Sequence, residues 1–175
     1  HLKEENHWAP DLVELRDVVT ERTKLIAVCN PNTPTGAILS DEEMASITEI
    51  ADRVGAWILA DEVYSGAERL TDEQTPTFWG RYDKVLAMNS LSKAYGLPGL
   101  RIGWVVAPTK VRDAIWRRHE YTTISATMLS NKLAAIALSP SVRPRLIERV
   151  RGYIRRGYAI FEDWLEEHEG TLSLV

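Results

Sequence analysis

The sequence has little cysteine, little phenylalanine and no long apolar run, and two of these scarcities exclude structural classes. Cys29 is the only cysteine among 175 residues, so no disulfide can form within the chain. No apolar run approaches the roughly 20 residues of a membrane-spanning helix, so we expect no membrane partner. The four histidines lack metal-ligand spacing, which argues against a metal. The mild net charge of −4 argues against nucleic acid as a partner.

What is present indicates an ordinary globular protein, with 45% hydrophobic and 26% charged residues. The single cysteine is typical of a cytoplasmic protein. The sequence starts at His1 without Met and stops at Val175 on what reads as the opening of a strand. We therefore expect these residues to be part of a longer protein.

The first part of the chain alternates between strand and helix patterns. Short apolar runs predict strands over residues 25–28, 56–60, 85–88 and 102–106. Helices are predicted over residues 10–19 and from the Ser40 cap to residue 54, where Ser40 and Glu43 form a capping box and Gly55 ends the helix. This order predicts an α/β fold, a three-layer αβα arrangement with a mainly parallel sheet.

After Pro108 the pattern is helical only. Helices are predicted over residues 110–120 and 128–138, followed by a long amphipathic helix over residues 142–168. We interpret the basic stretch 143–156 as a solvated face of that helix. A domain boundary along it predicts that residues 1–140 belong to a large domain, and that residues 141–175 are a connecting helix and the start of a small domain.

Lys93 is the residue with the clearest chemical context. It ends the sequence Ser90-Leu91-Ser92-Lys93, and a Gly/Pro-rich turn with Arg101 follows. A lysine can form an imine with an aldehyde, while neighbouring hydroxyls and an arginine can hold an anionic group of the same ligand. Pyridoxal phosphate carries both an aldehyde and a phosphate, so the sequence predicts this cofactor.

Other polar residues follow the predicted strands. Asn30-Pro31-Asn32-Thr33-Pro34-Thr35-Gly36 follows one strand, and Asp61-Glu62-Val63-Tyr64 follows the next. Ligands of open α/β sheets bind outside the carboxyl ends of the strands. We therefore expect these residues and Lys93 to share one site.

Taken together, these motifs resemble those of the class I/II aminotransferases, which are fold-type I pyridoxal-phosphate enzymes. The resemblance runs along nearly the whole chain. It implies that Lys93 is catalytic, because it forms the internal aldimine and moves a proton. It also implies that the residues that bind the cofactor are Thr33, Asp61, Tyr64, Ser90, Ser92, Lys93 and Arg101.

Each matched residue has an implied contact with the cofactor. Asp61 keeps the pyridine nitrogen protonated, and Tyr64 bonds the 3′-oxygen. Ser90 and Arg101 bind the phosphate with the assistance of Ser92.

One position departs from the family pattern. The family usually has a second Asn, which bonds the 3′-oxygen, where this chain has Thr33. The threonine side chain is shorter, but its hydroxyl can still donate. The family also implies a cis peptide bond at Thr33-Pro34.

The activity implied is transfer of an amino group between an amino acid and a 2-oxo acid. An alternative is a lyase, since Tyr64-Ser65-Gly66 and residues 90–99 also resemble the aminocyclopropane-carboxylate synthases. The sequence Pro34-Thr35-Gly36 argues against that alternative. A second alternative is a regulator in which such a domain senses the cofactor and is fused to a winged-helix module. The loop 30–36 and the sequence 61–64 look more like the enzymes.

The resemblance also implies parts that lie outside these residues. These are a glycine-containing phosphate loop, an aromatic residue that stacks on the ring, and an arginine for the substrate α-carboxylate. We therefore expect the 175 residues alone to be inactive. The family further implies a homodimer, with residues 121–125 near the interface.

Overall fold

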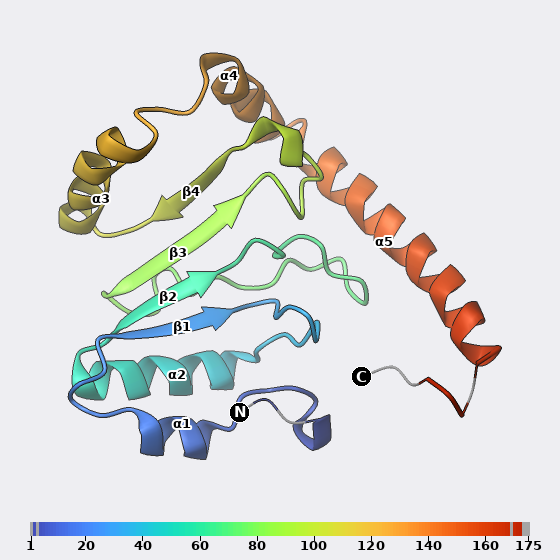
Figure 1. Ribbon diagram of the computed structural model, residues 1–175, viewed down its shortest axis with the longest axis horizontal. Helices are drawn as coiled ribbons and strands as arrows, with labels where there is room; N and C mark the ends of the chain where they lie inside the picture. The colour runs from blue at the N-terminus through green and yellow to red at the C-terminus, as the bar shows by residue number, and fades with distance from the viewer. Residues whose placement is uncertain (1, 3, 169, 173–175) are drawn as a thin grey trace.

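The computed structural model of the chain describes residues 2, 4–168 and 170–172 (Figure 1). A four-stranded sheet lies between helices on different sides. The strands are β1 (Leu25–Cys29), β2 (Trp57–Asp61), β3 (Val85–Ser90) and β4 (Gly103–Val106). The helices are α1 (Leu12–Val18), α2 (Asp41–Val54), α3 (Thr109–Thr122), α4 (Met128–Ala137) and α5 (Arg143–Glu166), with short 3₁₀ helices η1 (Glu4–Asn6) and η2 (Pro98–Leu100). All predicted strands and helices are present, and their ends differ from the predicted ones by at most two residues.

The sheet has the order β1-β2-β3-β4. The first three strands are parallel, and β4 is antiparallel to β3. The α/β class with a mainly parallel sheet is therefore confirmed. The direction of β4 matters for the site, because its amino end lies beside the carboxyl end of β3.

The main core lies between α2 and one face of the sheet. Met44, Ile47 and Ile50 of α2 are fully buried and belong to the same apolar cluster as Ile58 and Val85 of the strands. The helix starts with the predicted capping box, in which Ser40 accepts from the Glu43 N–H and Glu43 accepts from the Ser40 N–H. It ends at Gly55, whose left-handed backbone (φ +68°) suits glycine. These local signals fix where α2 begins and ends.

A second apolar cluster joins the turn after β3 to the helical part of the chain. Leu91, Ala94 and Tyr95 pack with residues of α4 and with Ile147 of α5. The interpretation of stretch 143–156 as solvated is wrong at one position, because Arg151 is buried and pairs with buried Glu68. Sequence periodicity could not reveal this, because the partner Glu68 lies far away in the chain.

The other face of the sheet is less covered by the described residues. In β2, Ile58 and Ala60 are buried on the side of α2, whereas the alternating residues Trp57 and Leu59 are half-buried. The outer edges of β1 and β4 have no strand partner in the described part of the chain. The helix α3 has no buried residue.

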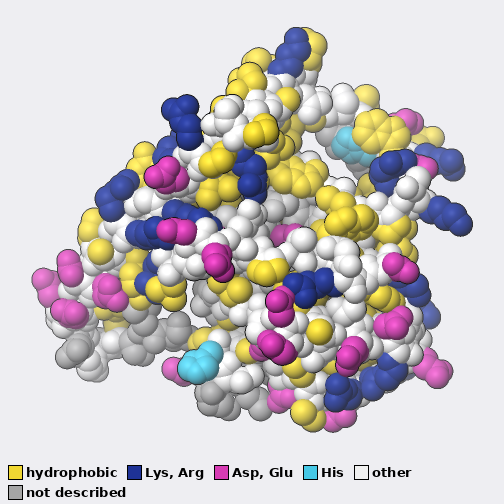
Figure 2. Space-filling view, turned by 180° about the vertical axis from the view of Figure 1, so that it is seen from behind, with side chains coloured by type: hydrophobic (Ala, Val, Ile, Leu, Met, Phe, Trp, Pro, Cys, Tyr) yellow, Lys and Arg dark blue, Asp and Glu magenta, His cyan; other side chains and the backbone are white. Residues whose placement is uncertain are grey.

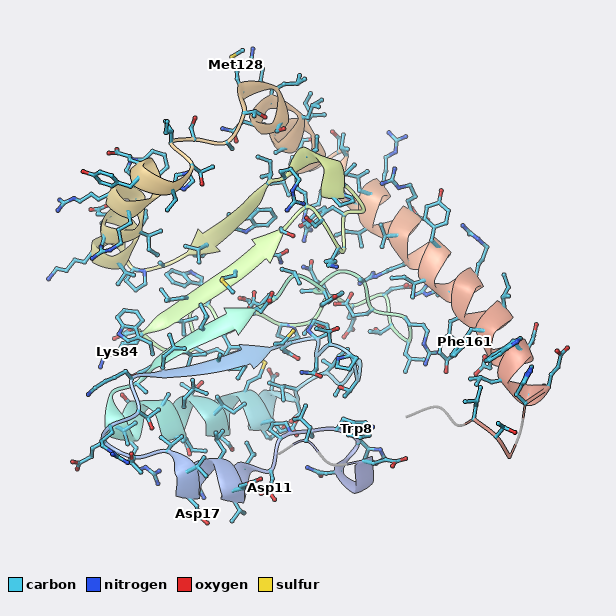
Figure 3. All side chains as sticks on the ribbon, in the orientation of Figure 1. Trp8, Asp11, Asp17, Lys84, Met128 and Phe161 are labelled. Carbon is cyan, nitrogen blue, oxygen red and sulfur yellow. The ribbon has the colours of Figure 1, made fainter. Side chains whose placement is uncertain are left out.

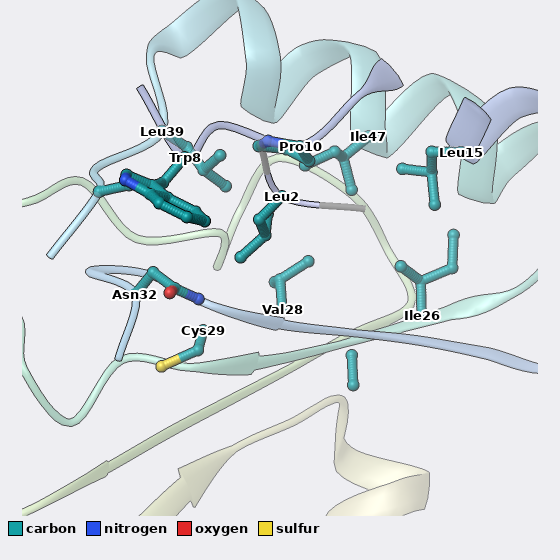
Figure 4. Close-up of a pocket in the computed structure, with 12 residues that line it drawn as sticks. Leu2, Trp8, Pro10, Leu15, Ile26, Val28, Cys29, Asn32, Leu39 and Ile47 are labelled. Carbon is teal, nitrogen blue, oxygen red and sulfur yellow. The ribbon is translucent and has the colours of Figure 1, made fainter. Parts of the chain in front are cut away.

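An apolar cavity of ≈ 280 Å³ lies between β1 and the amino-terminal segment (Figure 4). Leu2 and Trp8 cover it on one side, and Val28 of β1 faces it from the other. None of the residues predicted to bind the cofactor lines it, so this cavity is not the candidate site.

Lysine, arginine and acidic side chains are interspersed on the face seen in Figure 2. Within residues 2, 4–168 and 170–172, no helix has both the length and the apolar character needed to cross a membrane. The predicted long helix is confirmed as α5, with 24 residues. The domain boundary along it remains a prediction.

Candidate functional site

The loops that follow three parallel strands hold most of the predicted residues, at the edge of the sheet where these strands end. Because β1, β2 and β3 are parallel, their carboxyl ends meet there (Figure 1). Asp61 is in register with Cys29 of β1 and with Met88 of β3. The loops that follow these strands therefore start side by side.

Asp61 ends β2 and starts a tight turn. Its backbone carbonyl accepts from the Asn30 N–H at 2.9 Å, and its carboxylate Oδ1 accepts from the Val63 N–H at 3.2 Å. Val63 supplies the one hydrogen-bond donor to this carboxylate among the described residues. The half-buried Asp61 can therefore accept a further donor.

Lys93 and Tyr64 approach each other from the turns after β3 and β2. The Lys93 Nζ lies 5.7 Å from the centroid of the Tyr64 ring. The Ala94 N–H donates to the Val63 carbonyl at 3.4 Å, which joins the two turns. Lys93 is exposed and has no carboxylate partner among the described residues. Its amine is available for reaction.

Ser90, Ser92 and Arg101 lie at the junction of β3 and β4. The Ser92 N–H donates to the Ser90 Oγ at 3.1 Å. Ser90 pairs with Gly103, and the Leu91 N–H donates to the Ile102 carbonyl at 3.0 Å. This pairing brings Arg101 to the same end of β3 as Ser90. Arg101 has a left-handed backbone and donates one Nη1 bond to the Pro98 carbonyl at 2.9 Å.

Thr33 lies in the loop after β1 and is exposed. The predicted cis bond at Thr33-Pro34 is present, and Asn30-Pro31 is also cis. Buried Asn30 holds the loop by accepting from the Leu39 N–H at 2.9 Å, and Asn32 accepts from the Thr35 hydroxyl at 2.8 Å. The amide oxygen of Asn32 is thus used inside the loop.

Comparison with known proteins fits this arrangement. Residues 1–165 match the family described as aminotransferase class I and II. The chain belongs to this family.

Relatives of this aminotransferase chain are longer than the chain itself. It is 35% identical to the capreomycidine synthase of Streptomyces vinaceus, over 98% of the chain and 43% of that protein. It is 34% identical to an aromatic amino acid aminotransferase of Rhodococcus erythropolis, over 87% of the chain and 44% of that protein. A PLP-dependent aminotransferase structure from Streptococcus suis has 40% identity and a TM-score of 0.85, over 95% of the chain and 43% of that structure. The chain spans less than half the length of these relatives.

The residues of this aminotransferase chain fit pyridoxal phosphate. Lys93 supplies a primary amine that has no ion-pair partner within the described ranges, and Asp61 supplies a carboxylate that can accept a further donor. Two hydroxyls and a guanidinium at the β3–β4 junction suit a phosphate. No three His, Cys, Asp or Glu side chains gather as a metal site in the part of the chain that the structure describes.

Glu62, next to Asp61, was not singled out by the sequence. Burial raises the pKa of Glu62, although hydrogen bonds from the Phe78 N–H and the Thr77 hydroxyl act against that rise. Its side chain therefore points away from the solvent and anchors the segment 77–78. No local pattern reveals this burial, since the partners depend on the path of the long loop between β2 and β3.

Cys29 at the end of β1 is half-buried. Burial and the nearby Asp61 raise the pKa of its thiol, and the Sγ donates to the Pro31 carbonyl at 3.2 Å. The neutral thiol is thus the favoured form beside the candidate site.

Proposed function

We propose that the protein containing this chain transfers an amino group between an amino acid and a 2-oxo acid and uses pyridoxal phosphate as cofactor. The observation that carries the proposal is the amine of Lys93. It lies beside the Tyr64 ring, has no carboxylate partner among the described residues, and belongs to the same sheet edge as Asp61.

The cofactor supplies an aldehyde that reacts with amines and a ring that accepts electrons. In this proposal Ser90, Ser92 and Arg101 bind its phosphate, since a guanidinium fork and hydroxyls match phosphate oxygens. Asp61 holds a proton on the ring nitrogen, because a carboxylate stabilises a neighbouring cation. Tyr64 and Thr33 are proposed to bind the 3′-oxygen, and the shorter Thr33 replaces the usual Asn.

Lys93 has two roles in this proposal. Its Nζ binds the cofactor covalently between turnovers. When the substrate amine takes its place, the free Lys93 amine moves a proton between the substrate α-carbon and the C4′ carbon of the cofactor. The exposure of Lys93 leaves room for this exchange.

We also propose a homodimer located in the cytoplasm. Exposed apolar side chains on and beside α3 and α4, including Tyr121, Ile124 and Met128, support an interface there. A single free cysteine is in keeping with a reducing compartment. The division into a large domain over residues 1–140 and a connecting helix with the start of a small domain over residues 141–175 is part of the same proposal.

Borohydride reduction of the full-length protein with pyridoxal phosphate tests the covalent role. We expect mass spectrometry to find the reduced adduct on Lys93, and we expect Lys93→Ala to lose both the adduct and turnover. Lys84→Ala is the matched control, because Lys84 lies at the opposite end of β3 (Figure 3) and its Nζ donates to the Gly55 carbonyl at 2.9 Å. An adduct that persists in Lys93→Ala at the same pocket would refute the proposal.

Formation of pyridoxamine phosphate separates transfer from the lyase alternative. During incubation with an amino donor alone, amino transfer converts the cofactor to its amine form. Product formation from the donor without any pyridoxamine phosphate would favour elimination chemistry over the proposed activity.

A further inference from the structure

The ladder between β2 and β3 is interrupted where the candidate site begins. In a parallel pair, a residue of one strand donates its N–H to the carbonyl of a residue on the other strand. Its own carbonyl then accepts from the N–H of the residue two positions later on that other strand. Glu62 follows the first half of this rule, because its N–H donates to the Met88 carbonyl at 2.9 Å. The regular partner of the Glu62 carbonyl would be the Ser90 N–H.

The side chain of Asn89 stands between these two groups. Its Nδ2 donates to the Glu62 carbonyl at 2.9 Å, and its Oδ1 accepts from the Ser90 N–H at 2.7 Å. The Asn89 carboxamide thus connects the Glu62 carbonyl and the Ser90 N–H through two hydrogen bonds, in place of one direct bond between these backbone groups. Both backbone groups are satisfied, so the interruption leaves no unpaired polar group at this point.

The inserted carboxamide separates the two strands where their functional turns start. Glu62 follows Asp61 directly, and Ser90 starts the sequence that leads to Lys93. With a direct bond between Glu62 and Ser90, the strands would stay at the regular spacing of about 4.8 Å for one more residue. The bonds made by Asn89 therefore set the distance between the turn with the acid and the turn with the lysine.

The backbone beside Asn89 has little freedom to adjust. A Cβ placed on Gly103 of β4 would lie 3.2 Å from the Asn89 carbonyl oxygen and 3.4 Å from the Ser90 Cβ. The ladder with β4 thus fixes the main chain of Asn89 on one side, while its side chain holds β2 on the other.

We infer that Asn89 is a positioning residue that wedges β2 and β3 apart and so sets the gap in which the cofactor binds between Asp61 and the Ser90–Lys93 turn. This inference rests on the proposed function. Asn89 acts through the backbone of Glu62 and Ser90 and needs no contact with the cofactor.

Replacing Asn89 in the full-length holoenzyme tests the inference. In Asn89→Ala the Ser90 N–H can bond the Glu62 carbonyl directly, so the strands close by one residue. We expect kcat to fall about 10- to 100-fold, as for misplacements near 1 Å, and the dissociation constant for pyridoxal phosphate to rise. The Tm should fall by no more than about 4 °C, because the backbone bond is regained.

Asn89→Asp keeps one of the two hydrogen bonds made by the Asn89 side chain and removes the other. Its carboxylate still accepts from the Ser90 N–H but cannot donate to the Glu62 carbonyl. We expect this variant to keep pyridoxal phosphate affinity closer to that of the wild type than Asn89→Ala does, while kcat falls. If Asn89→Ala does not fold, Asn89→Asp alone decides the test.

Thr48→Val is the control, since it removes a hydrogen bond of 2.8 Å to the Met44 carbonyl within α2, away from the site. Wild-type kcat and cofactor affinity in both Asn89 variants would overturn the inference, and so would failure of both to fold. Absence of any lysine adduct or turnover in the wild type would instead refute the proposed function.

Discussion

Asp61 is the residue at which charge decides the proposed chemistry. Its carboxylate accepts from one backbone donor among the described residues and keeps capacity for a second. An amide of the same shape cannot stabilise a protonated ring nitrogen. In Asp61→Asn we therefore expect kcat to fall by about 100-fold or more, while the borohydride adduct at Lys93 still forms.

Asp83→Asn is the control for Asp61→Asn, because Asp83 is exposed and precedes β3 at the far end of the sheet. Steady-state kinetics of the full-length protein measures both variants. Equal kcat in Asp61→Asn and the wild type would remove Asp61 from the proposed machinery.

At the residue scale, the sequence identifies the groups that carry chemistry but not those that space them. Lys93 and Asp61 stand out because a reactive residue type follows a strand. Asn89 does not, because its role depends on the register of β2 against β3, which no local pattern reveals. The burial of Glu62 is hidden for a related reason, because its partners Thr77 and Phe78 lie in the long loop between β2 and β3, whose path no local pattern reveals.

At the scale of elements, a buried ion pair attaches α5 to the loop after β2. Arg151 donates to Glu68 and, at 2.6 Å, to the Asp72 carbonyl, and the Glu68 side chain is only 1% exposed. On the same face of α5, Arg155 pairs with Asp72, which is 86% exposed. The two pairs differ mainly in burial, so one serves as a control for the other.

Replacing Arg151 leaves the buried Glu68 carboxylate without its cationic partner. We expect Arg151→Met to lower the free energy of unfolding by about 3–5 kcal/mol. Arg155→Met should lower it far less, because water screens the exposed Arg155–Asp72 pair. Denaturant unfolding of the full-length protein measures both. Similar losses in the two variants would show that burial does not distinguish these pairs.

The Arg151–Glu68 pair makes the stability of the protein depend on pH in a direction that can be predicted. Burial alone would raise the pKa of Glu68, but hydrogen bonds from Gly66, Thr75 and Arg151 together hold the pKa below its usual range. A lowered pKa means that the contribution of Glu68 to stability is present at neutral pH and is lost as the pH falls through the lowered value.

We therefore expect the stability difference between the wild type and Glu68→Gln to be largest near neutral pH and to shrink below about pH 4. Unfolding measured over a pH series checks this. A difference that grows on acidification would contradict the lowered pKa.

The sequence predicts elements well where the signals are local. The Ser40 capping box and Gly55 mark both ends of α2 correctly. The direction of β4 could not be read from its residues, because an apolar run of four has the same pattern in either direction. The burial of Arg151 was also missed, because a basic helix face usually faces water.

At the scale of the whole molecule, the described chain leaves surfaces that a stable enzyme would cover. The outer edges of β1 and β4 are unpaired, and apolar side chains of α4 such as Leu129 and Ile136 are exposed. Phe161 lies on the part of α5 that extends away from the sheet (Figure 3). Open strand edges and apolar patches favour association with other chains.

We therefore expect the isolated 175 residues to self-associate and to lack turnover, whereas the full-length protein forms a discrete dimer. Light scattering after size-exclusion chromatography, together with an amino-transfer assay, measures both properties. Turnover by the isolated residues would contradict this expectation.

The antiparallel direction of β4 fixes how much backbone separates the residues proposed to hold the two ends of the cofactor. A parallel strand in its place would start at the opposite end of the sheet, so the chain would have to cross back over the sheet before entering it. Here the main chain turns back at the same end, within one hairpin closed by the Leu91–Ile102 hydrogen bond. The amine proposed for one end of the ligand and the guanidinium proposed for the other thus share a single short span of backbone. Insertions or deletions elsewhere, for example in the long loop between β2 and β3, can lengthen or shorten the protein without altering that span.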